Sequence, residues 1–270
     1  RGVVILVEER SNPTLQENVI SHGAVEGVVC RAALGCFLGN TISQHGGTMV
    51  VLEQGSTTTF LDNELRDGTG DGVLVSASRP LLQRNKILHM RGIGLHSTDQ
   101  AEMNVIDLEV GFVEVGIRLD EHCGGKFERL DLHHADRCLF DIRSAESLDF
   151  RHGVYHHSKQ DGVVIHAGNP QFMENEFHHN AGVAVKILTT AIDGPFLCDN
   201  AFVANGVGIE SLGPRSVADV KGNRFERNRQ EVAVNPELAK ELVQVANGQV
   251  AVSTRKVSSA TSGRKSSAGS

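Results

Sequence analysis

The sequence predicts an all-β protein, a right-handed parallel β-helix solenoid of about ten coils with a short C-terminal capping helix. Three observations predict it. Pairs of apolar residues five positions apart recur every 21 to 25 residues, an asparagine lies between most of these pairs, and a glycine followed by alternating apolar residues comes after most of them. A fixed repeat of this length is typical of solenoids, in which each coil buries its apolar side chains against its neighbours.

The repeated unit is clearest in two segments, Pro80–Ile87 and Pro170–Phe177. Both read apolar, two variable residues, asparagine, one variable residue and apolar, so the two apolar anchors lie five residues apart. No helical period occurs inside a coil, and the chain alternates as short strands do. The ten anchor pairs are Leu15/Ile20, Phe37/Ile42, Phe60/Leu65, Leu82/Ile87, Met103/Leu108, Phe127/Leu132, Phe150/Tyr155, Phe172/Phe177, Leu197/Phe202 and Val220/Phe225.

A second strand signal follows the pairs, as a glycine and then alternating apolar residues. The glycines that open these segments are Gly27, Gly72, Gly92, Gly116, Gly162 and Gly182. We therefore expect two or three strands of about four residues in each coil, separated by tight bends. Equivalent strands of successive coils would stack about 4.8 Å apart, the ordinary spacing between strands.

An asparagine between the two anchors recurs in seven of the ten coils. These residues are Asn18, Asn40, Asn63, Asn85, Asn175, Asn200 and Asn223. Asparagine tolerates left-handed backbone at a sharp bend, and its amide can bond to the asparagine above and below, so we expect a structural asparagine ladder inside the solenoid. Ile106, Leu130 and Gly153 take this position in the middle coils, where the ladder should break.

The repeat also indicates the domain boundaries. Residues 1–234 should form the β-helix, and because residues 2–7 already match the second strand of a coil, we expect the helix to be truncated at its N-terminal end. Asn235 and Pro236 are typical of a helix start, which predicts a capping helix over 235–248. Residues 249–270 are basic, rich in serine and without apolar period, which predicts a disordered tail.

Composition excludes several classes of function. The formal net charge of −7 argues against a nucleic-acid surface, and no apolar run is long enough to span a membrane. The five cysteines are odd in number and not closely paired, which favours reduced thiols and an intracellular, cytoplasmic or nuclear protein. Glycine pairs such as Gly92 and Gly94 belong to strands rather than phosphate loops, so we expect no cofactor.

Because a solenoid stacks equivalent residues, chemistry is expected in columns rather than in local motifs. Counted from the first anchor, positions six and seven carry histidines in three successive coils. They are His133 and His134, His156 and His157, and His178 and His179, with His22 and His89 at position seven of earlier coils. The acidic residues placed beside them are Asp107, Asp131 and Glu176 at position four, and Glu109.

Three interpretations of these columns remain open. They can be solvated polar surface without a specific role. His133, His156 and His178 can hold zinc or copper, because their imidazoles would lie about 4.8 Å apart. The columns can also perform acid–base chemistry on a bound sugar chain, for which the candidates are Asp107, Asp131, His133 and His156.

The segments Ser11–Ile20 and Leu34–Ile42 resemble the two alternating coil types of right-handed β-helix domains of the CASH, or pectate-lyase-like, superfamily. Over about residues 1–232, the chain is most similar to the β-helix of F-box ubiquitin-ligase substrate receptors and of the related SHC-binding proteins. The resemblance implies a domain that binds protein partners and has no catalytic residues to carry over. The F-box and the zinc-finger module of those ligases are absent from this chain.

We therefore predict a non-catalytic, protein-binding β-helix scaffold, with substrate recognition for a ubiquitin ligase as its candidate role. The alternative is a polysaccharide-acting β-helix enzyme, a lyase, epimerase or hydrolase, with carbohydrate as its partner. The sequence lacks tryptophan and the Asn-Thr-Asp, Gly-His-Gly and Asp-Pro-His motifs of such enzymes, which weighs against catalysis.

Overall fold

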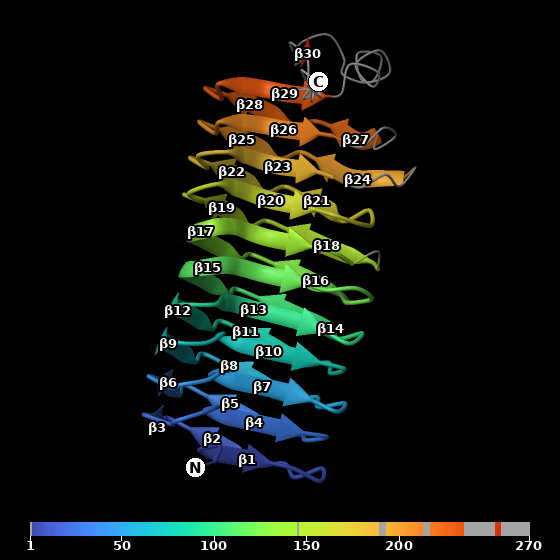
Figure 1. Cartoon of the computed structure of the whole chain (residues 1–270). Coiled ribbons are helices and arrows are strands. Elements are labelled where there is room, and N and C mark those ends of the chain that lie inside the picture. The colour runs from blue at the N-terminus through green and yellow to red at the C-terminus, as the bar shows by residue number, and fades with distance from the viewer. Residues whose placement is uncertain (1, 145, 189–192, 213–216, 235–251, 255–270) are drawn as a thin grey trace, which may run out of the picture.

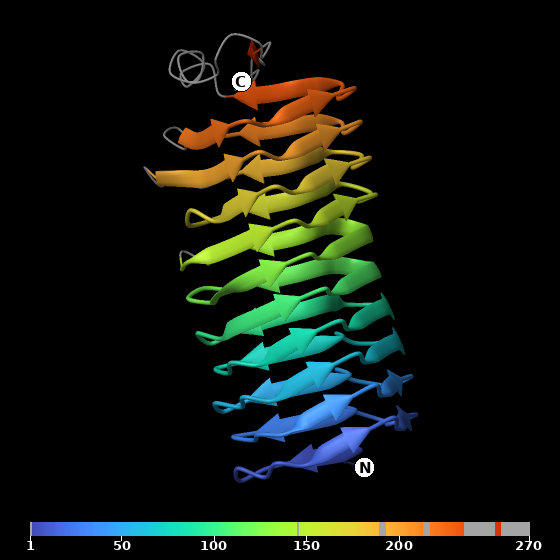
Figure 2. The ribbon, with the colours of Figure 1, turned by 180° about the vertical axis from the view of Figure 1, so that it is seen from behind.

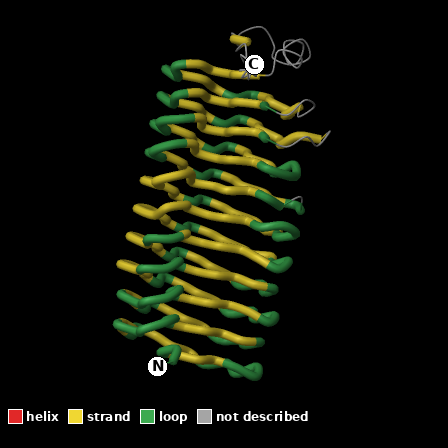
Figure 3. The backbone as a smooth tube through the Cα atoms, in the orientation of Figure 1, coloured by secondary structure: helices red, strands yellow, loops and turns green. Residues whose placement is uncertain are grey.

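The computed structural model describes residues 2–144, 146–188, 193–212, 217–234 and 252–254. This part of the chain is an all-β solenoid of parallel strands without a helix, a right-handed parallel β-helix as predicted (Figures 1 and 3). Its strands are β1 (Ile5–Val7), β2 (Thr14–Gln16), β3 (Val19–Ser21), β4 (Val28–Arg31), β5 (Cys36–Leu38), β6 (Thr41–Ser43), β7 (Val50–Glu53), β8 (Thr59–Leu61), β9 (Glu64–Gly68), β10 (Val73–Ser76), β11 (Leu81–Gln83), β12 (Lys86–Met90), β13 (Ile93–Thr98), β14 (Glu102–Ile106), β15 (Glu109–Leu119), β16 (Gly124–Glu128), β17 (Asp131–Ile142), β18 (Leu148–Arg151), β19 (Val154–His156), β20 (Asp161–Ile165), β21 (Gln171–Met173), β22 (Glu176–His178), β23 (Val183–Ile187), β24 (Asp193–Cys198), β25 (Ala201–Val203), β26 (Val207–Ser211), β27 (Val217–Lys221), β28 (Arg224–Glu226), β29 (Gln230–Val234) and β30 (Val252–Thr254).

The strands form three columns that run the length of the solenoid (Figures 1 and 2). A ten-stranded sheet contains every coil's first strand, from β2 to β27, and these ten copies make nine turns from first to last. We call the strands after the first bend (β3, β6, β9, β12, β19, β22, β25 and β28) the middle column, and those after the second bend (β4, β7, β10, β13, β20, β23, β26 and β29) the third column. β15 and β17 run through the second bend and join both columns into a twenty-stranded sheet.

The first bend and the second bend of each coil each contain one residue with left-handed backbone. At the first bend this residue comes immediately before the asparagine position, as at Glu17, Asp62 and Arg84, where φ lies between 54° and 55°. The asparagines themselves do not have positive φ, so the expected left-handed asparagine is wrong. The asparagine contributes its side-chain hydrogen bonds, and the preceding residue makes the turn.

The asparagines of the first bend are hydrogen-bonded to one another from coil to coil. Asn40 donates both its backbone N–H and its Nδ2 to Oδ1 of Asn63, each at 2.9 Å. Its Nδ2 also donates to the carbonyl of Leu15, at 2.8 Å. The same bonds recur along the two runs Asn18, Asn40, Asn63, Asn85 and Asn175, Asn200, Asn223. Each buried amide is thus satisfied within the solenoid, as burial requires.

A second asparagine ladder lies at the second bend and was not predicted. Asn180 donates to Oδ1 of Asn205 at 3.0 Å, and Asn205 donates to Oδ1 of Asn228 at 3.0 Å. In an earlier coil His45, 1 % exposed, lies at the same bend, with its ring nitrogens hydrogen-bonded to the N–H of Gly23 and the carbonyl of Ile20. The first and second bends of these coils are therefore held by side-chain amides or, at His45, by an imidazole.

Stacked aromatic anchors fill the core. Phe127, Phe150 and Phe172 follow one another at centroid distances of 4.7 Å and 4.5 Å, and Phe37 stacks on Phe60 at 4.4 Å. All five rings are at most 2 % exposed. Burying one such side chain contributes about 1.5–3 kcal/mol, so the aromatic stacks are a major source of the stability of the solenoid.

The register of one coil differs from the expected one. Val105, and not Met103, pairs with Leu82 below and Phe127 above. Val110, and not Leu108, continues the second anchor column from Ile87 to Leu132. Sequence alone could not decide, because this coil has apolar residues at both alternatives and no asparagine to mark the bend. Leu108, rather than Ile106, therefore takes the asparagine position, followed by Leu130 and Gly153 in the next two coils.

At the C-terminal end β30 pairs with β29 in parallel, with Val232 beside Val252. The expected capping helix over 235–248 lies outside the described residues, as does most of the expected basic tail.

None of the five cysteines, all of which are described, forms a disulfide. In the described part of the chain no helix is long and apolar enough to cross a membrane.

Candidate functional site

Two rows of histidines lie at the second bend of three successive coils. His133, His156 and His178 form the first row, as register partners on β17, β19 and β22. Their ring centroids are 5.4 Å and 4.6 Å apart. The second row consists of the next residue in each coil, His134, His157 and His179. These three have left-handed backbone, with φ between 52° and 57°. Each of their rings lies nearly perpendicular to the first-row ring of the same coil.

The second row continues into a longer stack of rings. His89 stacks on Phe112 at 4.6 Å, and Phe112 stacks on His134 at 4.8 Å. His157 and His179 follow at 5.1 Å and 5.2 Å. Every ring in this stack is within 17° of parallel to the next. The β-helix repeat thus aligns five rings along one edge of the solenoid.

The two rows are joined inside each coil through their Nδ1 atoms. The distances are 2.9 Å for His133 and His134, 2.6 Å for His156 and His157, and 2.9 Å for the third pair. One ring of each pair must donate and the other accept, because a neutral imidazole has one N–H. Burial, and then the neighbouring histidines, lower the pKa of His134 and His157. Burial and His156 likewise lower the pKa of His178.

Carboxylates flank the first row. Oδ1 of Asp131 lies 3.1 Å from Nε2 of His156, and this hydrogen bond holds the pKa of Asp131 below its usual range. Oε1 of Glu109 lies 3.5 Å from Nε2 of His133. Asp131, His133 and His156, three of the four residues suggested for acid–base work, therefore do lie together.

Asp107, the fourth, does not belong to this group. With Val105 as the anchor, Asp107 is the left-handed residue of the first bend, with φ 54°. Its two carboxylate oxygens accept from Arg129, at 2.6 Å and 3.1 Å. The expectation that Asp107 lies beside the histidines is wrong, because it depended on the incorrect register of that coil.

A metal-binding geometry exists within the two rows, but not with the set expected from sequence. His156, His157 and His178 each offer a nitrogen, and these atoms lie within 4.8 Å of one another. No other group of three or more histidines, cysteines or acidic residues of this kind occurs in the described residues. His133, the third residue of the expected set, lies outside the group.

A second polar cluster, which sequence reasoning missed, lies on the outer face of the third column. Asp141 is 1 % exposed and accepts from Arg143 at 3.2 Å and 3.0 Å and from Arg118 at 3.2 Å. Nε2 of His166 lies 3.2 Å and an Nη of Arg137 lies 3.7 Å from its oxygens. We call these five residues the guanidinium cluster. Burial alone would raise the pKa of Asp141, but the bond from Arg143 and the surrounding cations lower it overall.

A histidine between two carboxylates adjoins this cluster. His96 is the register partner of Arg118, and its ring lies 2.9 Å from Asp120 and 3.7 Å from Asp71. Burial lowers the pKa of His96, but the hydrogen bonds and charges of the two carboxylates outweigh it, and the net effect is a raised pKa. Burial also acts against the charge of Asp71, yet His96 and the N–H of Ile93 lower the pKa of that carboxyl overall.

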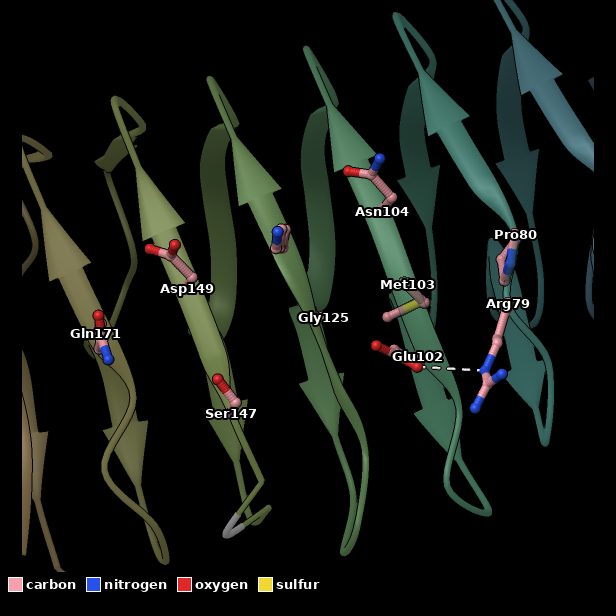
Figure 4. Close-up of a pocket in the computed structure, with 10 residues that line it drawn as sticks. Arg79, Pro80, Glu102, Met103, Asn104, Gly125, Ser147, Asp149 and Gln171 are labelled. Carbon is pink, nitrogen blue, oxygen red and sulfur yellow. Dashed lines mark ion pairs between the residues drawn. The ribbon is translucent and has the colours of Figure 1, made fainter.

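Three hollows follow one another around the bend from this cluster to the ten-stranded sheet. The first, of about 620 Å³, includes Asp120, His122 and Arg143. The second, of about 240 Å³, shares His122 with the first. It shares Glu102 with the third, of about 480 Å³, which extends across successive strands of the ten-stranded sheet (Figure 4). The third hollow is lined by Arg79, Pro80, Glu102, Met103, Asn104, Gly125, Lys126, Ser147, Asp149 and Gln171.

A signal for the guanidinium cluster was present in the sequence. The outward position of the third column reads Leu74, His96, Arg118 and Asp141 in successive coils. The change from apolar to charged residues marks the place. It could have been found by aligning the glycine-led strands as well as the anchors, although Gly116-Ile-Arg-Leu looks unremarkable by itself.

Comparisons with known proteins agree with the fold. The model of the family described as "Right handed beta helix region" matches residues 1–110. No curated protein is similar enough in sequence to count as a relative.

Solved structures of similar shape include the periplasmic alginate epimerase AlgG, which shares 10% sequence identity with this chain at a TM-score of 0.55, over 85% of this chain and 78% of that one. Two point mutants of that enzyme, also at 10% identity, match with TM-scores of 0.62 and 0.58. They cover 94% and 86% of this chain, and 77% and 78% of their own. Similarity at this identity shows the fold alone.

Proposed function

We propose that this protein acts on an anionic polysaccharide that contains uronate units, as an epimerase or a lyase, through the guanidinium cluster. The observation that carries the proposal is the set of three guanidinium groups, from Arg118, Arg137 and Arg143, around the single buried carboxylate of Asp141. Glu114 neutralises part of Arg137 at 3.4 Å. The three guanidinium groups therefore exceed Asp141 and Glu114 by one positive charge. Arg143 lines a hollow together with three acidic residues, Asp99, Asp120 and Glu121.

The chemistry of uronates requires such a charge. The hydrogen on the carbon next to a carboxylate is removed only if the negative charge that develops on the carboxylate is stabilised. Guanidinium groups fixed in place supply that stabilisation without reorganisation at the moment of reaction. Arg143, half-exposed at the hollow and held by Asp141, is the residue in the position to do so.

An acid and a base lie within the same region. His166 is partly exposed and bonded to Asp141, and His96 lies against Asp120. One imidazole removes the proton next to the carboxylate. If a proton returns to the opposite face of the carbon, the product is the epimer. If the electron pair instead expels the neighbouring glycosidic oxygen, the chain is cleaved and a carbon–carbon double bond remains. Histidine suits both roles near neutral pH.

The likeness to alginate epimerase supports this class of substrate, because alginate is an anionic polysaccharide. The continuous series of hollows offers an extended polymer more than one point of contact. The Asp-Pro-His motif is absent from this sequence, so the proposal depends on this chain's own cluster.

The protein-binding scaffold favoured by the sequence gains no such support. Neither the family match nor the structural neighbours point to F-box receptors or SHC-binding proteins. A ubiquitin-ligase role depends solely on the resemblance of two coil types.

The test is incubation of the full chain with alginate, polygalacturonate and hyaluronan. Ultraviolet absorbance detects the conjugated product of a lyase, and proton NMR detects a change in epimer ratio. We expect turnover of at least one polymer, and Arg143→Gln should lower it about 100-fold or more. The matched control is Arg66→Gln, which removes an equally exposed arginine paired with Glu64 and Asp67 elsewhere. No turnover by the wild type, or equal turnover by Arg143→Gln, would overturn the proposal.

A further inference from the structure

We propose that His156, His157 and His178 form a binding site for a divalent transition-metal ion, with Asp131 positioning the first of them. This site lies at the second bend and is separate from the guanidinium cluster, so it does not depend on the proposed polysaccharide activity. The argument starts from the three nitrogens that lie within 4.8 Å of one another on two adjacent coils.

The spacing of these nitrogens suits a small cation. Zinc binds imidazole nitrogens at about 2.0 Å, so two ligand nitrogens in a tetrahedral site are about 3.3 Å apart. Nδ1 of His156 and Nδ1 of His157 are 2.6 Å apart, and one nitrogen from each of the three rings lies within 4.8 Å of the others, a range that includes this value. His157 is exposed and the other two side chains are partly exposed, so side-chain rotation can bring three nitrogens around one ion.

Asp131 gives the site a carboxylate–histidine arrangement. Its Oδ1 accepts from Nε2 of His156 at 3.1 Å, which fixes the proton on Nε2. The lone pair of His156 is then on Nδ1, directed toward His157. Metal-bound histidines commonly donate their other ring N–H to a carboxylate in this way, which orients the ring and increases its basicity.

The β-helix fixes the spacing of the ligand-bearing residues before any metal arrives. His156 and His178 are register partners on β19 and β22, and their rings are stacked within 9° at 4.6 Å. His157 is held by stacking between His134 and His179. Because the strands fix the spacing, little conformational entropy is lost when the ion binds.

The ligand set indicates the kind of metal. Three imidazoles and one carboxylate in the outer sphere favour zinc, copper(II) or nickel over magnesium or calcium, which prefer oxygen ligands. Among these, copper(II) should bind most tightly, following the general order of stability for nitrogen sites. Water or a ligand would complete the coordination.

The experiment is titration of the full chain, without a polyhistidine tag, with copper(II) and zinc chloride in competition with a chelator. We expect one equivalent to bind, and electron paramagnetic resonance of the copper form to show nitrogen coordination. His157→Asn and His178→Gln should each weaken binding at least tenfold. Asp131→Asn should weaken it about 10–100-fold, and Asp131→Glu should restore part of the affinity, which a purely structural role would not predict.

The matched control is His22→Asn. His22 lies at the same bend, three turns before His89, the first ring of the stack. It has the same left-handed backbone, at φ 61°, and it hydrogen-bonds Ser21 rather than a second histidine. This variant should bind metal like the wild type. Circular dichroism and thermal unfolding of every variant verify the fold. Magnesium and calcium serve as negative controls. Binding by His157→Asn and His178→Gln equal to the wild type, or no binding of either transition metal by the wild type, overturns the proposal.

Discussion

The phenolic oxygen of Tyr155 lies 3.3 Å from Oδ1 of Asn175. The one tyrosine of the chain thus reaches the first asparagine of the first-bend run Asn175, Asn200 and Asn223. Burial raises the pKa of Tyr155, so its hydroxyl stays protonated and donates. Gly153, in the asparagine position of the same coil, makes room: a Cβ there would lie 2.2 Å from the tyrosine oxygen. The hydroxyl thus replaces the side chain that the ladder lacks.

We expect Tyr155→Phe to lower the free energy of unfolding by about 1 kcal/mol, the usual net contribution of one buried hydrogen bond. The loss stays small because Asn175 still accepts the N–H of Gly153 at 2.8 Å. Gly153→Ala should cost more, about 1–3 kcal/mol, through overpacking against the ring. Thermal unfolding of both variants checks the order. A larger effect for Tyr155→Phe would contradict the assignment of the hydroxyl.

Asn63→Ala should destabilise the solenoid by about 3 kcal/mol, because it leaves several buried polar groups without partners. Oδ1 of Asn63 accepts two bonds from Asn40, and its Nδ2 donates to the carbonyl of Phe37 and to Asn85. The control is Asn18→Ala at the exposed end of the run, where the cost should be about 1 kcal/mol. Hydrogen exchange of the neighbouring amides would locate the effect, and equal costs for both variants would contradict it.

Asp141→Asn should lower stability at neutral pH by about 3 kcal/mol, because the cations around the buried carboxylate lose their partner. The folded-state pKa of Asp141 lies below its unfolded value of about 3.9. The contribution is therefore complete above about pH 4 and is lost as the pH falls through the folded pKa. Unfolding curves from pH 7 to pH 3 should show wild type and variant converging only in acid. A constant difference would exclude the ionised carboxylate as its source.

His96→Gln should have the opposite pH dependence. The pKa of His96 is raised in the folded state, so its interaction with Asp71 and Asp120 stabilises fully below about pH 6.5, the unfolded value, and is lost as the pH rises through the folded pKa. The stability difference between wild type and variant should therefore be largest in mild acid and shrink in alkali. The same unfolding series measures it, and a difference that grows with pH would contradict the pairing.

The cysteines should fall into two classes of reactivity. Burial raises the pKa of Cys30 and of Cys138 to about 12, and also raises that of Cys123, so these thiols should not react in the native state. Cys36 and Cys198 are only half-buried. A thiol reagent should label at most these two before unfolding and all five in denaturant. Fast native labelling of Cys30 would show that the first coils open readily.

The sequence was sufficient for the repeat because each anchor pair is tested against all the others. Phe37 and Phe60, or Phe150 and Phe172, are recognised by their spacing, and the stacked core follows from it. The same principle failed where a coil offered two solutions. Met103 and Val105 are both buried, at 2 % and 0 %, so hydrophobicity could not select the anchor, and the placement of Asp107 failed with it.

The guanidinium cluster could not be read from any one coil. Arg118, Asp141 and His166 come from three coils, and each is ordinary in its own stretch of sequence. The ion pairs exist only after the strands are stacked, because Asp141 contacts Arg118 of one adjacent coil and His166 of the other. The histidine rows were visible because identical residues repeat. A column of different, complementary charges repeats no residue, and it appears only as a change from apolar to charged residues once the third strands of successive coils are aligned.

The asparagine ladders also give the solenoid an electrical direction. In both ladders each amide donates toward the C-terminal coil, from Asn40 to Asn63 and from Asn180 to Asn205, so the amide dipoles are aligned head to tail. Aligned bonds polarise one another, and a lost rung should therefore weaken the rungs beside it. Leu108 and Leu130, whose side chains carry no amide, divide the first ladder into two polarised segments. In the middle coils the chain of side-chain amide hydrogen bonds is therefore interrupted between two parallel rows of dipoles. The histidine rows begin in these middle coils.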